Sequence, residues 1–171
     1  MARLFVGLIS DTHGIFDPQF KEFFKDVDVI WHAGDFGGGA DFAKEIADFK
    51  PVVGVCGNCD GQDIRFEYPE TQFLCEQGVK ILMTHIAGSP GHYNLRVAAM
   101  IDNYRPDVLV CGHSHILKVQ RDHSNNLLYI NPGAAGLQGW QIVRTALRFK
   151  IEDGELKYME VFQLPREAKV Y

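Results

Sequence analysis

Five short apolar segments constrain this chain most, because each of them runs directly into a polar cluster. The segments are residues 4–9, 27–31, 52–56, 79–83 and 107–111. Apolar runs of this length are typical of buried strands, and the amphipathic stretches between them indicate a sheet crossed by helices. The clusters that follow are, in order, Ser10-Asp11-Thr12-His13, His32-Ala33-Gly34-Asp35, Gly57-Asn58-Cys59-Asp60, Thr84-His85 and Gly112-His113-Ser114-His115.

Three helices are expected between these strands. Asp17 and Pro18 have the residue types of an N-cap and a first helical turn, and Pro51 and Pro106 end the second and third helices. The apolar positions of each helix repeat at helical spacing and should face the core. They are Phe20, Phe23, Phe24 and Val27 in the first, Phe42, Ile46 and Phe49 in the second, and Val97, Met100, Ile101 and Tyr104 in the third.

The last third of the chain is predicted to consist of β-hairpins. Alternating apolar residues flank turn-forming residues twice, which is the usual signal of paired antiparallel strands. No linker or internal repeat interrupts the chain, so we expect residues 1–171 to form one α/β domain. The predicted hairpins pair residues 117–120 with 127–130, and residues 147–151 with 156–161.

Charge and composition exclude several classes of protein. The 171 residues include 17 Lys and Arg against 22 Asp and Glu, a net charge of −5, without a basic block. Nucleic acid is therefore a disfavoured partner, because backbone binding depends on clustered Lys and Arg. No run approaches the ~20 apolar residues that cross a bilayer, so we expect a cytoplasmic protein without membrane contact. The Cys56-x-x-Cys59 pair is by itself a weak zinc or redox signal.

The polar clusters indicate a metal site. Ligands bind at the carboxyl ends of the strands in open α/β sheets, so these side chains should converge on one crevice. In D-x-H and H-x-H, an extended backbone would place the outer two side chains on the same side. Seven candidate ligands exceed the ~4 that close one tetrahedral site, and a bridging carboxylate would give four contacts to each of two ions. The candidates are Asp11, His13, Asp35, Asn58, His85, His113 and His115.

The ordered set D-x-H, GD, GN-x-D, H and GH-x-H resembles the calcineurin-like metallophosphoesterases. The tripeptide Asn131-Pro132-Gly133 resembles the small prokaryotic phosphodiesterase branch, and the likeness spans residues 8–133. It implies two packed mixed β-sheets flanked by helices, a four-layer α/β/β/α sandwich. It also implies that Asp35 bridges two ions. In the resemblance, Asp11, His13, Asp35 and His115 hold one ion, and Asp35, Asn58, His85 and His113 hold the other.

The function implied by this resemblance is a metal-dependent phosphodiesterase that uses a bridging hydroxide as nucleophile on a small phosphodiester. Asn58 and His85 would then be catalytic as well as ligands. The ligand types suit Mn, Ni, Fe, Co or Zn. A nuclease and a protein-binding scaffold, similar to the retromer subunit of this superfamily, are the alternatives, and the complete ligand set favours catalysis. Homo-oligomer formation stays open.

Two departures from the family pattern affect the predicted site. Many members have His where this chain has Cys59, so leaving-group protonation should be weak and Cys59→His should raise the rate on esters with poor leaving groups. Ala134 stands where this branch often has Ser. We predict His92, Asn131 and Gly133 as substrate contacts. His32 is expected to be a hydrogen-bonded core residue or to support a ligand.

Overall fold

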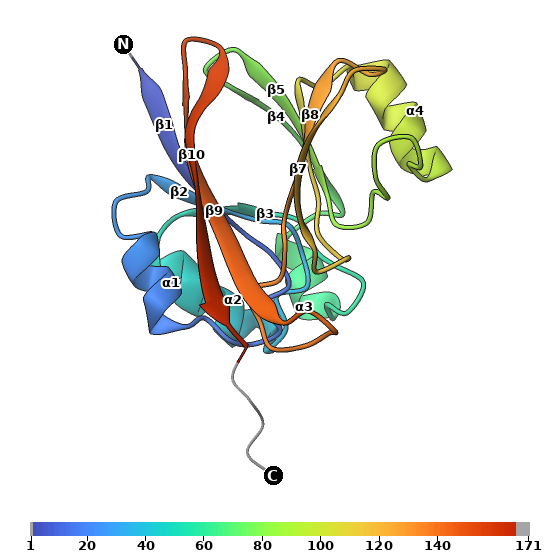
Figure 1. The fold of residues 1–171 in the computed structure, drawn as a ribbon. Coiled ribbons are helices and arrows are strands. Elements are labelled where there is room, and N and C mark those ends of the chain that lie inside the picture. The colour runs from blue at the N-terminus through green and yellow to red at the C-terminus, as the bar shows by residue number, and fades with distance from the viewer. Residues whose placement is uncertain (1, 167–171) are drawn as a thin grey trace.

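The computed structural model describes residues 2–166, which form two five-stranded mixed sheets (Figure 1). The first sheet has the order β10 (Glu155–Pro165), β9 (Val143–Glu152), β1 (Arg3–Ile9), β2 (Val29–His32) and β3 (Val52–Gly54). The second has the order β4 (Thr71–Glu76), β5 (Val79–Thr84), β6 (Val108–Val110), β8 (Leu127–Pro132) and β7 (Leu117–Asp122). The parallel strands β1, β2 and β3 of the first sheet are extended on one side by antiparallel strands, and the parallel centre of the second sheet is extended on both sides.

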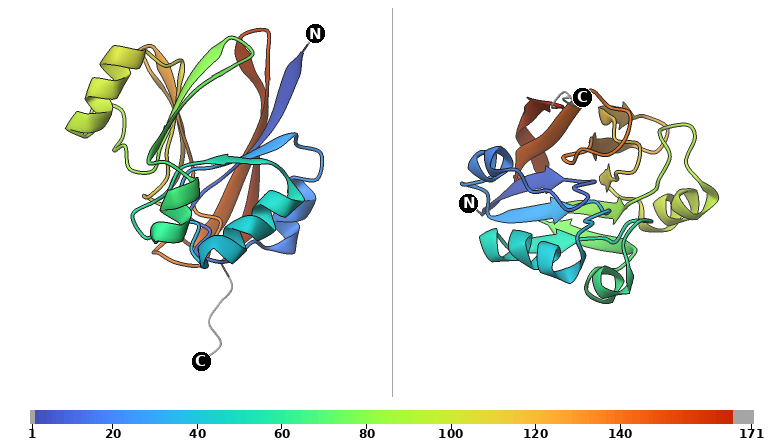
Figure 2. Two further views of the ribbon diagram at one scale, coloured as in Figure 1. Left: turned by 180° about the vertical axis from the view of Figure 1, so that it is seen from behind. Right: turned by 90° about the horizontal axis from the view of Figure 1, so that it is seen from below.

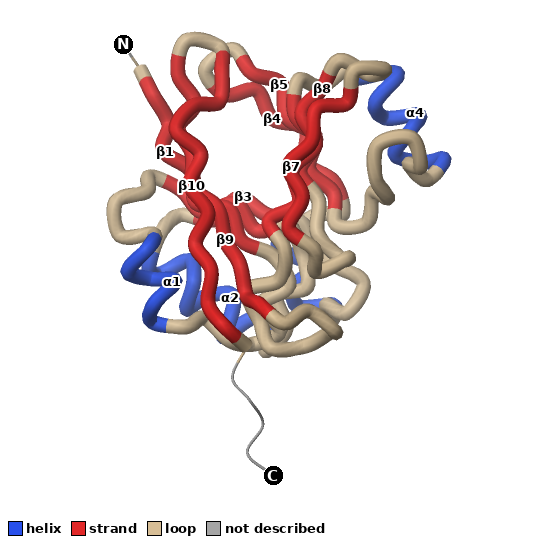
Figure 3. Tube along the Cα trace, in the orientation of Figure 1, coloured by secondary structure: helices blue, strands red, loops and turns tan. Residues whose placement is uncertain are grey.

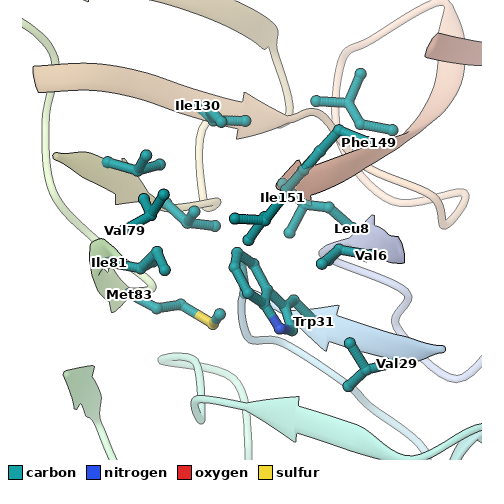
Figure 4. Packing of buried hydrophobic residues seen from close by; sticks show 14 of the residues in the cluster. Val6, Leu8, Val29, Trp31, Val79, Ile81, Met83, Ile130, Phe149 and Ile151 are labelled. Carbon is teal, nitrogen blue, oxygen red and sulfur yellow. The ribbon is translucent and has the colours of Figure 1, made fainter. Parts of the chain in front are cut away.

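Alternation along the strands divides the apolar residues between two faces of each sheet. Val6 and Leu8 of β1 and Trp31 of β2 point into the core between the sheets, where they meet Ile81 and Met83 of β5 (Figure 4). The period of two residues along a strand produces this division. The space between the sheets is therefore a packed core.

Helices cover the two outer faces, so the four layers are helix, sheet, sheet and helix, as the resemblance implied. Residues on α1 (Pro18–Phe23), α2 (Gly39–Phe49) and α3 (Gln62–Glu67) pack in one cluster with the outer face of the first sheet. The α4 helix (Leu95–Tyr104) packs on the second sheet. Figure 2 shows α4 on the side of the molecule opposite α1 and α2.

The two ends of the sheets differ in what they carry. The tips of the β4–β5, β7–β8 and β9–β10 hairpins lie at one end, which is uppermost in Figure 1. The loops that follow β1, β2, β3, β5 and β6 lie at the other end, where Figure 3 shows loops gathered below the strands. These loops contain the predicted metal ligands.

The main strands and both hairpins are confirmed, and three details differ from expectation. The α1 helix ends at Phe23, so Val27 is buried in the turn beyond the helix. The helix α3 and the strand β4 were not predicted from the sequence. No position of β4 is fully buried, so an edge strand of this kind lacks a clear alternating pattern. Within residues 2–166, no helix is long and apolar enough to span a membrane.

Candidate metal centre

The loop after β1 carries Asp11 and His13. The Asp11 amide donates a hydrogen bond to the carbonyl of Gly34 (2.9 Å), which joins this loop to the one after β2. The Asp11 side chain is fully buried, and its Oδ2 accepts hydrogen bonds from the Ser10 hydroxyl (2.6 Å) and the His113 amide (3.1 Å). One carboxylate oxygen of Asp11 is therefore used for support, and Oδ1 faces the histidines.

The loop after β2 carries Asp35, which divides its two oxygens in the same way. Its Oδ1 accepts a hydrogen bond from the Cys59 amide (2.8 Å) in the loop after β3. That close approach requires Gly57, because a Cβ there would overlap the Asp35 carboxylate. The second oxygen, Oδ2, is left to face the imidazoles of His13 and His85.

The imidazoles from the loops after β1, β5 and β6 complete two groups of candidate ligands. Asp35 Oδ2 lies 3.8 Å from His13 Nε2 and 3.2 Å from His85 Nε2, so a single oxygen lies between the two groups. This position suits a carboxylate that bridges two ions. In the first group, ligand atoms of Asp11, His13 and His115 lie within 4.8 Å of one another, and in the second those of Asp35, His85 and His113 do so.

Hydrogen bonds at the far side of two imidazole rings determine which nitrogen faces the centre. Nδ1 of His85 lies 2.7 Å from the Ala33 carbonyl, which can only accept, so this nitrogen carries the proton. Nδ1 of His115 donates in the same way to Gln141 Oε1 (3.2 Å). In neutral rings, Nε2 then presents its lone pair to the centre, where Nε2 of His115 lies 3.1 Å from Asp11 Oδ1. Metal-binding histidines in proteins are usually oriented by such bonds.

Two buried nitrogens provide the test of whether these residues fit a metal. Among the described residues, three buried side-chain atoms have no hydrogen-bond partner: Nε of Arg144, and Nε2 of His13 and of His85, which both lie near carboxylates. A buried polar atom without a partner is costly, and a lone pair facing a carboxylate is repelled unless a cation lies between them. The residues therefore fit divalent ions. Imidazole and carboxylate ligands suit Mn, Fe, Co, Ni and Zn.

The electrostatics of the centre support the same arrangement. Burial would raise the pKa of Asp35, but in the metal-free chain a protonated His85 ring takes the place of a cation, and this ring, the Cys59 amide and His13 outweigh burial and lower the pKa of Asp35 to about 2. Burial likewise opposes ionisation of Asp11, and the surrounding histidines still hold the pKa of that carboxyl below its usual value. Both carboxylates are consequently charged at neutral pH and available to cations.

The backbone at the ligands differs from the extended geometry expected for D-x-H and H-x-H. Asp11 and His13 have φ values of 53° and 46°, and His113 and His115 have values of 73° and 64°. These residues, and Asp35 at 57°, are in the left-handed region, which costs non-glycine residues about 1–2 kcal/mol each. The paired side chains converge because of two left-handed residues per triplet, and the explanation from strand alternation was wrong.

Two buried side chains behind the ligands hold the loops in place. His32 accepts from the Gly34 amide at Nδ1 (3.1 Å), so its Nε2 carries the proton and donates to the Thr12 hydroxyl (3.0 Å). Burial lowers the pKa of His32 to about 3, which keeps this ring neutral. Asp60 accepts from the Gly57 amide (2.8 Å) and also from two amides after Asp35. His32 and Asp60 are therefore positioning residues.

Asn58 and Cys59 lie at the exposed rim of the centre. Asn58 Oδ1 is 3.2 Å from Nδ1 of His113, which places the amide beside the second ligand group. Its Nδ2 donates to Cys59 Sγ (3.5 Å). Burial, followed by the nearby Asp35 carboxylate, raises the pKa of the Cys59 thiol, so the thiol is protonated at neutral pH. The catalytic roles of both residues stay predictions.

The three predicted substrate contacts lie in different surroundings. His92 is exposed in the loop before α4, and its role stays a prediction. Asn131 is buried, and its amide is occupied by the Gly112 carbonyl (3.0 Å), the Ser114 hydroxyl (3.0 Å) and the Gly133 amide (3.0 Å). With no polar atom of its side chain free, Asn131 positions the loop of His113 and His115, and its contacts do not support an assignment as a substrate contact. The Gly133 amide is the group that donates to the side-chain oxygen of Asn131, and the role of Gly133 as a substrate contact stays a prediction.

One supporting residue was missed from the sequence. Gln141 donates from Nε2 to the Gln138 carbonyl (2.6 Å), which fixes its Oε1 toward His115. It lies in the irregular segment before β9, 26 residues after the histidine that it orients. No spacing rule connects the two positions, so only the folded chain reveals the contact.

The residue sets and layers described above match a known family. The family model of the calcineurin-like phosphoesterase superfamily domain matches residues 4–154. The chain belongs to this superfamily. A protein named "Probable metallophosphoesterase" from Mycoplasma pneumoniae is 30% identical over 137 residues, 75% of this chain and 77% of its own length. One of the same name from Methanothermobacter thermautotrophicus is 26% identical over 141 residues, 77% of each protein.

Solved structures share the fold of this superfamily member. A predicted phosphoesterase from Streptococcus pneumoniae superposes with a TM-score of 0.67 at 23% identity, covering 100% of this chain and 94% of that chain. Vps29 from Entamoeba histolytica, whose crystal structure is a complex with Zn²⁺, has a TM-score of 0.72 at 17% identity, covering 96% and 100%. At these identities the structures support the fold alone.

Proposed function

We propose that this metallophosphoesterase is a phosphodiesterase that acts on small phosphodiesters with two divalent ions. The observation that carries the proposal is the pair of buried, unpartnered Nε2 atoms of His13 and His85 beside the carboxylates of Asp11 and Asp35. A fold needs no such arrangement for stability, because it leaves polar atoms without partners. Strained residues and perturbed pKa values gathered at one site are typical of active sites.

The choice of a diester rests on the space around the centre. One pocket includes His85 and Asn58 in its wall, and a second includes His113. Ile86 lines both pockets. A phosphodiester has two ester substituents and a monoester has one, so two pockets that border the second ligand group favour the diester.

Bound ions would supply Lewis acidity toward phosphate and lower the pKa of water. The chain itself would orient the substrate. Asn58 presents its amide at the rim, where an N–H can donate to a phosphate oxygen. The protonated thiol of Cys59 lies beside that amide and is the group that would protonate a leaving oxygen. A thiol is a weak acid for this role, so esters with acidic leaving groups should be the better substrates.

A protein-binding role is the second candidate, and one observation favours it. Trp140 is 100% exposed and Ile142 is 82% exposed on either side of Gln141, which contacts His115. Exposed apolar side chains of this size beside a site are typical of surfaces that bind another molecule. Because the candidate ligands are complete in the same chain, catalysis is the stronger proposal.

The test uses the metal. The protein is stripped with a chelator, reloaded with Mn²⁺, Ni²⁺, Zn²⁺ or Mg²⁺, and assayed with bis(p-nitrophenyl) phosphate and with p-nitrophenyl phosphate. We expect more than about 100-fold activation by at least one transition ion, since metal catalysis contributes several kcal/mol, and faster turnover of the diester. Equal activity without metal would remove the mechanism. Faster turnover of the monoester would make the protein a phosphatase, and metal binding without turnover of either ester would favour the protein-binding role.

A further inference from the structure

The pocket beside His85 contains two arginines. Its cavity of about 210 Å³ has Asn58 and His85 on the side of the metal ligands, and Arg65 from α3 and Arg96 from α4 also line it. Neither arginine belongs to the two groups of candidate metal ligands. Two guanidinium groups in a cavity that opens beside a phosphate-binding centre indicate that something anionic occupies it.

The two arginines differ in how much of their hydrogen-bonding capacity is used. Arg65 donates to the carbonyls of Asp60 (3.0 Å) and Gly57 (2.9 Å) and pairs with Glu70 at 3.5 Å. It therefore braces the loop that carries Asn58, and it neutralises Glu70, the one carboxylate in the pocket wall. Arg65 has little capacity left for a ligand.

Arg96 is held in place without being neutralised. Its two terminal nitrogens donate to the hydroxyls of Thr71 (3.2 Å) and Thr84 (3.1 Å). Across residues 2–166, no carboxylate lies within 4.0 Å of its guanidinium. A guanidinium has five N–H donors, so three remain after the two threonines. Arg96 is thus a positioned cation with a free hydrogen-bonding edge.

We propose that Arg96 determines specificity by binding a second anionic group, of the phosphate class, on one arm of the diester substrate. The inference rests on the proposed function, which places the scissile phosphate at the metal ligands. The planar guanidinium matches the oxygens of phosphate, and charge-assisted hydrogen bonds of this kind are stronger than neutral ones. The substrate is then unsymmetrical, with an anionic arm in the pocket of Arg96.

The other pocket that Ile86 lines provides an internal comparison. It is lined by Ile116 and Tyr129 as well as His113, and its one cation, Lys118, lies over the ring of Tyr129 at 5.9 Å from the centroid. This lining suits an apolar or planar ester group. Lys118 is the cation that would bind the second anion if the two arms were placed the other way round.

The experiment compares two ligands that differ by one phosphate. Protein loaded with Mn²⁺ and dialysed is titrated calorimetrically with thymidine 5′-phosphate and with thymidine 3′,5′-bisphosphate. We expect the bisphosphate to bind at least about tenfold more tightly, as hydrogen bonds between charged groups predict. Arg96→Gln should abolish the preference, Arg96→Lys should retain part of it, and Lys118→Gln should leave it intact. Arg105→Gln, at the other end of α4, is the matched control and should change nothing.

Several results would overturn the proposal. They are equal affinity of the wild-type protein for both ligands, a preference that survives Arg96→Gln, and a preference lost in Lys118→Gln. Thermal melting of each variant separates loss of binding from loss of folding. Turnover of bis(p-nitrophenyl) phosphate by the wild-type protein tests the proposed function separately. If that diester is not hydrolysed, the proposed function fails, and the ratio of the two dissociation constants still decides the role of Arg96.

Discussion

Both ends of the sheets contain non-glycine residues in the left-handed backbone region, so the two ends can be compared directly. At the hairpin end, these residues are exposed and lie in turns between antiparallel strands; they are Gln77, Asn126 and Asp153. The opposite end of the sheets carries the candidate metal ligands and is called the metal end. There the left-handed residues follow central strands and bring ionisable side chains together; they are Asp11, His13, Asp35, His113 and His115. The same backbone strain is therefore compensated by different contacts at the two ends.

In the hairpins the compensation is local. The left-handed Asp153 is followed by Gly154, at which an added Cβ would meet no atom within 4 Å. At the metal end the compensation comes from other loops, such as the Cys59 amide on Asp35 and the Gly34 carbonyl on Asp11. A strained ligand is therefore held by residues distant in sequence, and substitutions at the two ends should have different consequences.

The largest difference is expected between Asp35→Asn and Asp153→Asn. The two aspartates have φ values of 57° and 55°, and asparagine tolerates this region, so each substitution removes a charge without a new backbone strain. Asp35→Asn should lower kcat/KM for bis(p-nitrophenyl) phosphate more than about 100-fold and release at least one ion, because the carboxylate proposed to bridge the two ions is lost. Asp153→Asn should change neither quantity. Retention of both ions by Asp35→Asn would contradict its bridging role.

A smaller difference is expected between two glycines. In Gly57→Ala the new Cβ overlaps the Asp35 carboxylate, so the loop must shift at a cost of about 1–3 kcal/mol and Mn²⁺ affinity should fall about tenfold. Gly154→Ala should cost about 1 kcal/mol through its positive φ alone and leave Mn²⁺ affinity unchanged. Urea unfolding and Mn²⁺ titration measure the two effects. Equal Mn²⁺ affinity in both variants would show that Asp35 tolerates the shift.

At neutral pH the smallest difference is expected between His32→Gln at the metal end and His123→Gln at a hairpin tip, because the effect of His32 on stability changes only in acid. The pKa of His32 is lowered from 6.5 to about 3 by burial, so the unfolded chain binds a proton that the folded chain does not. His32 therefore stabilises the fold above pH 6.5, and this contribution falls by up to about 1.4 kcal/mol per pH unit between pH 6.5 and 3.

Urea unfolding of metal-free protein across that pH range measures the effect. His32→Gln should flatten the acid loss of stability relative to wild type, and His123→Gln, at an exposed position, should not. All other residues are the same in the three proteins, so their contributions cancel in the comparison. Parallel curves for wild type and His32→Gln would show that His32 is not neutral in the folded state.

The sequence places the candidate ligands at one end of the sheets because the information is local. A polar Asp or His after a buried apolar run indicates both where the strand ends and where a ligand could bind. Because parallel strands of one sheet end at the same edge, five such strand ends indicate a single site. The alternation of Val6 and Leu8 with their outward neighbours likewise determines the faces of β1. These features depend on neighbouring residues along the chain.

The features that sequence missed depend on contacts across the fold. Gln141 orients His115 from another loop, and Arg96 reaches its pocket only after α4 packs on the second sheet. The left-handed ligands follow from bonds between separate loops, so a rule for extended strands could not predict them. Asn131 has a motif position that suggests ligand binding, yet its folded contacts give it a positioning role.

The proposed chemistry depends on two ions that bind next to each other with Asp35 between them. The most direct measurement is an electron paramagnetic resonance titration of the metal-free protein with Mn²⁺, alongside elemental analysis of the dialysed product. We predict two Mn²⁺ ions per chain and a spin-coupled spectrum from neighbouring ions as the second equivalent binds. A single ion per chain, or two ions with uncoupled spectra, would contradict a pair of ions bridged by Asp35.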